Sequence, residues 1–257
     1  MKVTVCELPN DSEGLDRAWQ ALVSHVREAQ SDLVVLPEMP FHRWVAHSRD
    51  FREEDWVETV EAHDRWMPRL DDLSPALVAS TRPVTWQGAR LNAAYVREPG
   101  GEPRFVHTKY YLPDEPGFWE QSWYQRGDGS FRPVDIGRGS LGFLVCTELW
   151  FNKHAREYAG QGVQLLICPR ATPRASTDKW VAGGRTAAVV SGAYCLSSNL
   201  GGTTQQGGDY AGTGWVIEPE EGEVLGLTSV EQPFVTVDID LGAADAAKRS
   251  YPRYVPG

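Results

Sequence analysis

Three residues with reactive side chains stand at or shortly after the ends of short apolar runs. Glu38 follows VVLP, Lys109 follows an apolar pair that begins at Phe105, and Cys146 follows GFLV. Strand ends on a packed scaffold are where α/β proteins place chemistry, because the sheet fixes position while the loops admit substrate. Taken singly, each residue has a simpler explanation: a helix cap, a surface lysine or a small core cysteine. A carboxylate, an amine and a thiol at one sheet edge could instead carry out covalent catalysis.

The segments around these three residues resemble a known family. VVLPE, HTKYYLPDEPGFWE and LGFLVCTELWF, in that order, resemble the three signature regions of the nitrilase (carbon–nitrogen hydrolase) superfamily. The resemblance implies that Glu38 is the general base, that Lys109 stabilises the tetrahedral intermediate and that Cys146 is the nucleophile. The second region looks like the N-carbamoylputrescine amidase branch, in which a second glutamate follows the lysine at this interval, and this implies that Glu120 is an additional active-site carboxylate. Further similarity in LLICPRATP and YCLSSN extends the resemblance over most of the chain.

The implied reaction needs residues of these types. An amide carbon is a poor electrophile, so a thiolate must attack it, and an acyl-enzyme divides one hard step into two. Because an unperturbed cysteine is mostly protonated at neutral pH, Glu38 is expected to take the proton of Cys146. Lys109 and the backbone N–H of Thr147 are expected to form an oxyanion hole. The charge of Lys109 is also expected to keep Glu38 and Glu120 ionised.

The chain departs from the family pattern beside the nucleophile. Relatives usually carry Asp two residues after the cysteine, where this chain has Glu148, and often Pro-Glu where it has Asn152 and Lys153. Glu148 keeps the charge but reaches further, so we expect a different wall on the substrate side. Trp119 and Trp150 adjoin the reactive residues, and they could line the pocket or simply pack in the core.

A basic stretch inside this acidic chain follows a predicted strand. Arg170 and Arg174 lie in ICPRATPR, and in relatives the loop after this strand borders the pocket. An arginine fork can bind a carboxylate through two hydrogen bonds, so both residues are candidates for holding a substrate carboxylate. The alternative is that they pair with acidic groups on a neighbouring helix or subunit.

Hydrophobic periodicity predicts many short strands separated by helices. Helices are expected over residues 15–26, 51–70, 152–160 and 177–190. Strands are expected over residues 3–8, 33–36, 76–80, 93–97, 104–107, 141–146, 163–168, 194–198, 214–218 and 234–239. We interpret residues 1–257 as one α/β domain, with helices packed on the outer faces of sheets. The resemblance implies an α-β-β-α sandwich that pairs into an αββα–αββα dimer or a higher homo-oligomer.

The amino-acid composition limits the classes of binding partner that we expect. The formal net charge of −10 argues against nucleic acid and against an anionic membrane surface. The first ten residues favour a strand and a turn over a signal peptide, and no run approaches the ~20 apolar residues of a membrane span. The four cysteines and six histidines show neither C-x-x-C nor zinc-ligand spacing. We therefore expect a cytoplasmic protein without a metal, acting on a small amide or carbamoyl substrate, and the resemblance implies no cofactor.

Other functions remain open. The same residues could serve a nitrilase, or a transferase that passes the acyl group to an amine instead of water. A member of the fold that binds without turnover is a further alternative, as is a papain-like hydrolase, although no histidine is placed by the sequence to activate Cys146. The G-x-G-x-x-G match at residues 137–142 precedes a strand and opens no helix, so it is interpreted as a turn.

Overall fold

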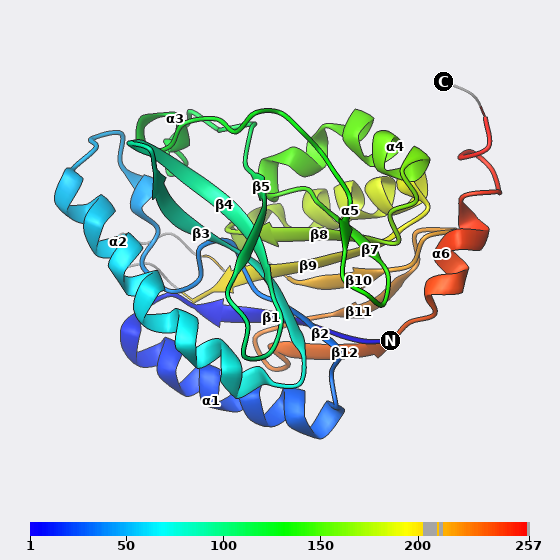
Figure 1. Cartoon of the computed structure of the whole chain (residues 1–257), viewed down its shortest axis with the longest axis horizontal. Coiled ribbons are helices and arrows are strands. Elements are labelled where there is room, and N and C mark those ends of the chain that lie inside the picture. The colour runs from blue at the N-terminus through cyan, green and yellow to red at the C-terminus, as the bar shows by residue number, and fades with distance from the viewer. Residues whose placement is uncertain (203–209, 211–212, 256–257) are drawn as a thin grey trace.

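Two β-sheets lie between two groups of helices (Figure 1). The computed structural model describes residues 1–202, 210 and 213–255. Helices α1 and α2 cover one sheet, and α4 and α5 cover the other. The helices are α1 (Ser12–Ala29), α2 (Glu53–Trp66), α3 (Glu120–Trp123), α4 (Asn152–Gly160), α5 (Thr177–Ser191) and α6 (Leu241–Ala247). This arrangement confirms the predicted α-β-β-α fold.

Strand β1 joins the two sheets. The strand order is β5-β4-β3-β2-β1-β9-β8-β7-β6, with β12 paired to β1 and the β10–β11 pair joined to β9. The first part of β1 pairs with β2 and β12, and its last residues, 7–9, pair with β9. The strands are β1 (Lys2–Pro9), β2 (Leu33–Val35), β3 (Leu77–Trp86), β4 (Ala89–Arg97), β5 (Arg104–Thr108), β6 (Val134–Asp135), β7 (Ser140–Phe143), β8 (Leu165–Arg170), β9 (Tyr194–Gly201), β10 (Trp215–Ile217), β11 (Val224–Leu227) and β12 (Phe234–Asp238).

Alternating side chains of β1 build two different cores. Val3 and Val5 belong to the large core between the sheets, whereas Cys6 and Leu8 pack with α1. The alternation follows from the two-residue repeat of a strand. Both faces of β1 are therefore buried, which explains why its sequence is apolar almost throughout.

Two predicted elements end earlier than their apolar patterns suggest. The strand expected over residues 141–146 stops at Phe143, and Cys146 begins a short 3-10 helix, Cys146–Trp150. The helix expected over residues 51–70 is α-helical only to Trp66. Pro68 stands at the start of the 3-10 helix that follows, where it lacks the N–H that would continue an α-helix.

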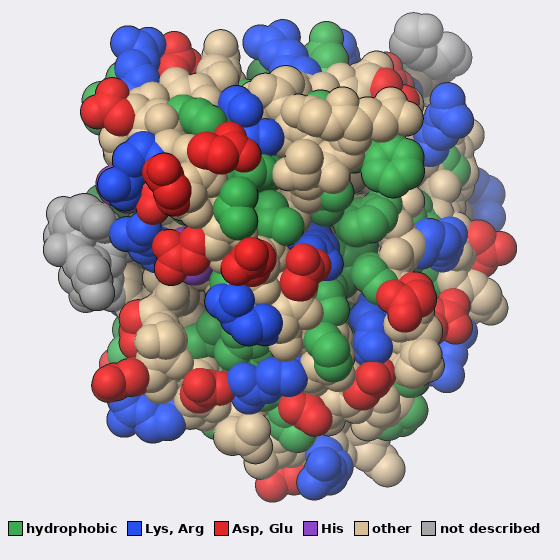
Figure 2. Space-filling view, turned by 60° about the vertical axis from the view of Figure 1, so that its left-hand side comes forward, with side chains coloured by type: hydrophobic (Ala, Val, Ile, Leu, Met, Phe, Trp, Pro, Cys, Tyr) green, Lys and Arg blue, Asp and Glu red, His purple; other side chains and the backbone are tan. Residues whose placement is uncertain are grey.

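Charges on the surface are mixed. Figure 2 shows Lys and Arg side chains alternating with Asp and Glu on one face, with apolar side chains between them. This face therefore lacks the single-sign basic stripe typical of a nucleic-acid surface. Among the helices of the described ranges, none combines the length and the apolar character that crossing a membrane requires.

Candidate active site

A buried lysine lies between two buried carboxylates. Lys109, which directly follows β5, donates from Nζ to Glu38 Oε1 at 2.8 Å and to Glu120 Oε1 at 2.7 Å. Glu38 follows β2, and Glu120 begins α3. All three residues are fully buried. The structure thus brings together three predicted site residues from distant parts of the chain.

Each carboxylate keeps one oxygen that has no protein partner. Glu38 Oε2 and Glu120 Oε2 are buried, and neither makes a hydrogen bond with the described residues. Buried polar atoms are nearly always paired, so two unpaired oxygens beside one lysine mark a place where another molecule can bind. The oxygen of Glu38 that accepts from Lys109, Oε1, also accepts from the side-chain amide of Asn92 at 2.7 Å.

Asn92 is a site residue that the sequence analysis missed. It lies in β4 and is fully buried. The available signal was a polar side chain inside the otherwise apolar stretch LNAAYV, because a buried amide on a strand needs a partner. Its backbone carbonyl also accepts from Lys109 N at 2.9 Å, so Asn92 holds both members of the Glu38–Lys109 pair.

Burial changes the charge expected of this cluster. Although desolvation opposes the charge of Lys109, the neighbouring Glu120 and Glu38 raise its pKa well above the usual value. Desolvation raises the pKa of Glu120 to about 8, against the opposing effect of Lys109 and with a further increase from Glu38. The direction of this shift opposes the prediction that Lys109 keeps both carboxylates ionised, because one ammonium group acts against the burial of two carboxylates.

Cys146 stands at a sharp turn beside this cluster. It has φ of 49°, in the left-handed region that residues other than glycine rarely adopt, and only 4 % of its surface is exposed. Such strain is often kept at functional positions. The N–H groups of Cys146 and Thr147 belong to the first turn of a 3-10 helix, where they have no acceptor within the helix. The N–H of Thr147 therefore stays a predicted oxyanion donor.

The electrostatics of Cys146 favour a protonated thiol in the free site. Desolvation, followed by the negative charge of Glu38, raises the pKa of the thiol to about 12. Lys109 and a backbone hydrogen bond from Ala171 act in the opposite direction but are smaller effects. The free site therefore holds a protonated thiol, and the proton must leave during the reaction.

Glu148 lies behind the nucleophile and contacts protein donors. Its Oε1 accepts from Tyr110 N at 2.7 Å, and its Oε2 accepts from Val145 N at 2.9 Å. His107 Nε2 lies 2.8 Å from the same Oε2. Both oxygens are thus occupied, so the position of Glu148 departs from the predicted substrate contact. His107, a second residue that the sequence analysis missed, is also buried.

The two candidate arginines occupy different environments. Arg170 is fully buried and donates to Ser197 Oγ and Thr172 Oγ1, each at 2.7 Å. Its guanidinium lies 4.0 Å from the ring centre of Trp215. These contacts favour a role in packing over the predicted substrate contact. Arg174 is exposed, and its charge is a smaller influence, after a backbone hydrogen bond and Ser229, among the effects that lower the pKa of the nearby Glu231.

The two tryptophans lie in aromatic contacts near the surface. Trp150 is 37 % exposed, and its ring centre lies 4.9 Å from that of Trp180. Trp119 is partly buried, with the guanidinium of Arg49 4.5 Å above its ring. Tyr210, which the sequence analysis did not select, lies close enough to the site that Cys146 adds to burial in raising its pKa. These rings are candidates for the pocket wall.

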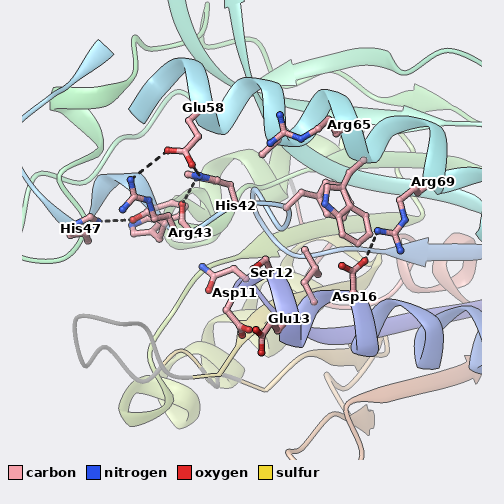
Figure 3. A pocket seen from close by; sticks show the side chains of 16 residues that line it. Asp11, Ser12, Glu13, Asp16, His42, Arg43, His47, Glu58, Arg65 and Arg69 are labelled. Atoms are coloured by element: carbon pink, nitrogen blue, oxygen red, sulfur yellow. Dashed lines mark hydrogen bonds and ion pairs between the residues drawn. The ribbon is translucent and has the colours of Figure 1, made fainter. Parts of the chain in front are cut away.

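A large groove lies elsewhere on the molecule (Figure 3). It has a volume of about 860 Å³ and runs between the start of α1, the loop after β2, and α2. Its lining includes none of Glu38, Lys109, Glu120 and Cys146. Charges along it are largely paired, as with Arg69 and Asp16 at 2.6 Å. Within the described part of the chain, no three His, Cys, Asp or Glu side chains are grouped so that they could hold a metal ion.

Comparison with known proteins identifies the family of this chain. The carbon-nitrogen hydrolase family model matches residues 2–249. The chain therefore belongs to the carbon–nitrogen hydrolase family, which confirms the resemblance inferred from its sequence. It is 30 % identical over 249 residues to a glutamine-dependent NAD(+) synthetase from Rhodobacter capsulatus, covering 94 % of this chain and 43 % of the synthetase. It is 29 % identical over 83 residues to an N-carbamoylputrescine amidase from Solanum tuberosum, covering 32 % of this chain and 28 % of the amidase. The chain thus matches less than half the length of either relative.

Solved structures agree with the fold. A carbon-nitrogen hydrolase from Helicobacter pylori G27 superposes with a TM-score of 0.87 at 22 % identity, covering 98 % of this chain and 94 % of the other. A mutant amidase from Nesterenkonia sp. AN1, solved with the acetamide moiety of fluoroacetamide attached to its active-site cysteine, superposes with a TM-score of 0.78 at 21 % identity, covering 95 % and 92 % of the two chains. At these identities the likeness shows the shared fold.

Proposed function

We propose that this chain hydrolyses the C–N bond of a linear amide or an N-carbamoyl compound through a thioester on Cys146. The observation that carries the proposal is the buried Glu38–Lys109–Glu120 cluster, which keeps two unpaired carboxylate oxygens and whose charges act on the strained Cys146. Relatives that are amidases and carbamoyl hydrolases support the reaction class.

The first half of the reaction forms the thioester. Glu38 Oε2 accepts the thiol proton while Cys146 Sγ attacks the carbonyl carbon. Negative charge develops on the carbonyl oxygen, and Lys109 Nζ and the N–H of Thr147 stabilise it. The C–N bond then breaks, and the leaving nitrogen takes the proton from Glu38, so ammonia or an amine departs.

The second half releases the acid. A water molecule gives its proton to Glu38 and attacks the thioester, and the departing sulfur takes that proton back. The thiol and the Glu38 carboxylate are thereby restored. Burial raises the pKa of Glu120 to about 8 and so favours its protonated form, which can donate a hydrogen bond from its unpaired oxygen to the substrate. Every proton in this scheme is moved by these side chains and water.

A release assay tests the proposal. The wild-type protein is incubated with a panel of linear amides, including glutamine, carbamoyl amines and nitriles, and ammonia, amine and free acid are measured. We expect release from at least one amide or carbamoyl compound and none from a Cys146→Ala variant. Release from nitriles alone would assign a nitrilase, and an acyl product formed with an added amine in place of free acid would assign a transferase.

Two outcomes would reject hydrolysis at this site. One is the absence of any product across the panel from the folded wild-type protein, which would favour a binding function. The other is equal release by the wild-type protein and the Cys146→Ala variant, which would place the chemistry elsewhere.

A further inference from the structure

The two halves of the candidate site come from different sheets and need something to align them. Lys109 follows β5 at one end of the strand order, whereas Cys146 follows β7 near the other. Catalysis by a lysine and a thiol depends on their separation, because an oxyanion donor must lie within hydrogen-bond distance of the developing charge. A direct link between the two segments would therefore control the reaction.

Glu148 forms this link. One of its oxygens accepts from the N–H of Tyr110, the residue after Lys109, at 2.7 Å. The other accepts from the N–H of Val145, the residue before Cys146, at 2.9 Å. A single rigid carboxylate therefore joins the immediate neighbours of both reactive residues. The Val145 contact also restrains the entry to the strained turn at Cys146.

His107 completes the arrangement. Its Nδ1 lies 3.2 Å from the carbonyl of Ser130, and its Nε2 lies 2.8 Å from Glu148 Oε2. Both partners are acceptors, so both ring nitrogens donate only when the imidazole is protonated; although burial opposes that charge, Glu148 raises the pKa of His107. Both Glu148 and His107 are buried, so solvent does not compete for these bonds. A carboxylate is needed at this place because it only accepts hydrogen bonds, and here it faces three donors. Aspartate, one methylene shorter, would lose the reach between Tyr110 and Val145.

We propose that Glu148, held by His107, is a positioning residue that sets Lys109 relative to Cys146. Glu148 touches neither substrate nor the reacting atoms, and it acts through the two backbone segments that carry them. The kinetic part of this proposal rests on the proposed amide or carbamoyl hydrolysis. The structural part, the link between the two segments, does not depend on it.

Glu148→Gln is the central test. The amide group has one acceptor oxygen, so at least one of the N–H groups of Tyr110 and Val145 would face a donor. Small misplacement of reacting groups can lower a rate about 10²-fold, and we expect a fall in kcat of about that size. KM should stay within about threefold of the wild-type value, because loss of alignment in the transition state lowers kcat without weakening substrate binding.

Glu157→Gln is the matched control. Glu157 also accepts from a histidine at 2.7 Å, His154 on α4, but its side chain is 53 % exposed. We expect its kcat to equal that of the wild-type protein. His107→Gln removes the imidazole while leaving the two backbone contacts of Glu148, so it should lower kcat about tenfold and serves as the test if Glu148→Gln does not fold.

Amide hydrogen exchange gives a readout that is independent of activity. In Glu148→Gln, exchange at Tyr110 and Val145 should accelerate together, and in Glu157→Gln it should not. If the wild-type protein hydrolyses no substrate of the panel, the proposed function fails while exchange still tests the link. The positioning role is overturned by a folded Glu148→Gln variant with wild-type kcat, by a loss that appears only in KM, or by unchanged exchange at both residues.

Discussion

The thiol of Cys146 is protonated in the free site because burial and the charge of Glu38 raise its pKa to about 12. A resting thiolate beside two carboxylates would be strongly repelled. The proton therefore leaves only when Glu38 can take it and Lys109 can stabilise the charge that forms on the substrate. Coupling deprotonation to substrate binding also protects the thiol from unproductive reactions.

Alkylation kinetics test this protonation state. Iodoacetamide should modify Cys146 first, because 4 % of its surface is exposed and none of the surface of Cys6, Cys168 or Cys195. The rate should rise about tenfold per pH unit from pH 7 to 9, since the thiolate fraction grows tenfold per unit below the pKa. Rates are measured from peptide maps at each pH. A plateau near neutral pH would show that the resting cysteine is already a thiolate.

The raised pKa of Glu120 makes the stability of the folded protein depend on pH. Its pKa rises from 4.5 to about 8 on folding, mainly through desolvation, so between these values the folded state holds a proton that the unfolded state has lost. The contribution of Glu120 to the free energy of unfolding must therefore fall as pH rises from about 4.5 to about 8.

Glu120→Gln isolates this contribution, because glutamine does not ionise. The Tm of the wild-type protein should fall relative to that of the variant as pH increases from 5 to 8. Calorimetric scans of both proteins across this range provide the measurement, and effects of other titrating groups cancel in the difference. Parallel Tm curves would show that Glu120 ionises normally.

At the scale of elements, close packing beneath β7 fixes the approach to Cys146. A Cβ placed on Gly142 would lie 2.6–2.8 Å from ring atoms of Tyr158 on α4. The Tyr158 hydroxyl donates to the carbonyl of Phe143 at 3.1 Å, so the ring cannot move without breaking that bond. Helix α4 and the strand leading to the nucleophile are thus locked together.

Gly142→Ala should destabilise the protein by about 1–3 kcal/mol, the usual cost of overpacking a filled core. The midpoint of urea unfolding, at an unchanged m-value, measures the loss. Gly160→Ala on α4 is the control, since nothing lies within 4 Å of its added Cβ, and it should be neutral or stabilising by up to about 1 kcal/mol. Equal midpoints for the two variants would contradict this account.

Sequence patterns predicted the apolar strands and the residues at their ends more readily than they predicted turns. Apolar runs located β1, β2 and β8 because strands buried on both faces are apolar nearly throughout. The turn at Cys146 was not predicted, because the preceding residue, Val145, is held by the side chain of Glu148, which also contacts His107 of β5. Glu148 and Asn92 contact residues that are distant in the sequence, Tyr110 and Glu38 respectively, and a local sequence pattern does not predict such contacts.

Charges at the site were the hardest feature to predict. The identities of Glu38, Lys109, Glu120 and Cys146 followed from motifs, and the structure brings the two carboxylates and the lysine into direct contact. Their protonation depends on how completely water is excluded and on how many charges share the space. Full burial of the cluster raises the pKa of both Cys146 and Glu120, and no sequence pattern reports that burial.

At the scale of the whole molecule, exposed apolar surface favours the predicted self-association. Tyr251 and Tyr254 are 72 % and 63 % exposed, and a shallow apolar depression lies along α5 beside Val189 and Val190. Aromatic residues are enriched in interfaces between subunits. Sedimentation at micromolar concentration should give a species of at least twice the 28.6 kDa chain mass. A single 28.6 kDa species would contradict the predicted dimer.

The double pairing of β1 has a consequence for the order in which the chain acquires structure during synthesis. Lys2 pairs with Asp238, and Glu7 pairs with Asn199, so β1 is made long before β12 and β9, two of its three partner strands. At typical rates of translation, the time between the synthesis of β1 and that of these two strands is on the order of tens of seconds. Throughout this time, β1 has an apolar edge without its final partners, and such edges are prone to aggregation. The nucleophile and its lysine are therefore translated well before the sheet that aligns them can close.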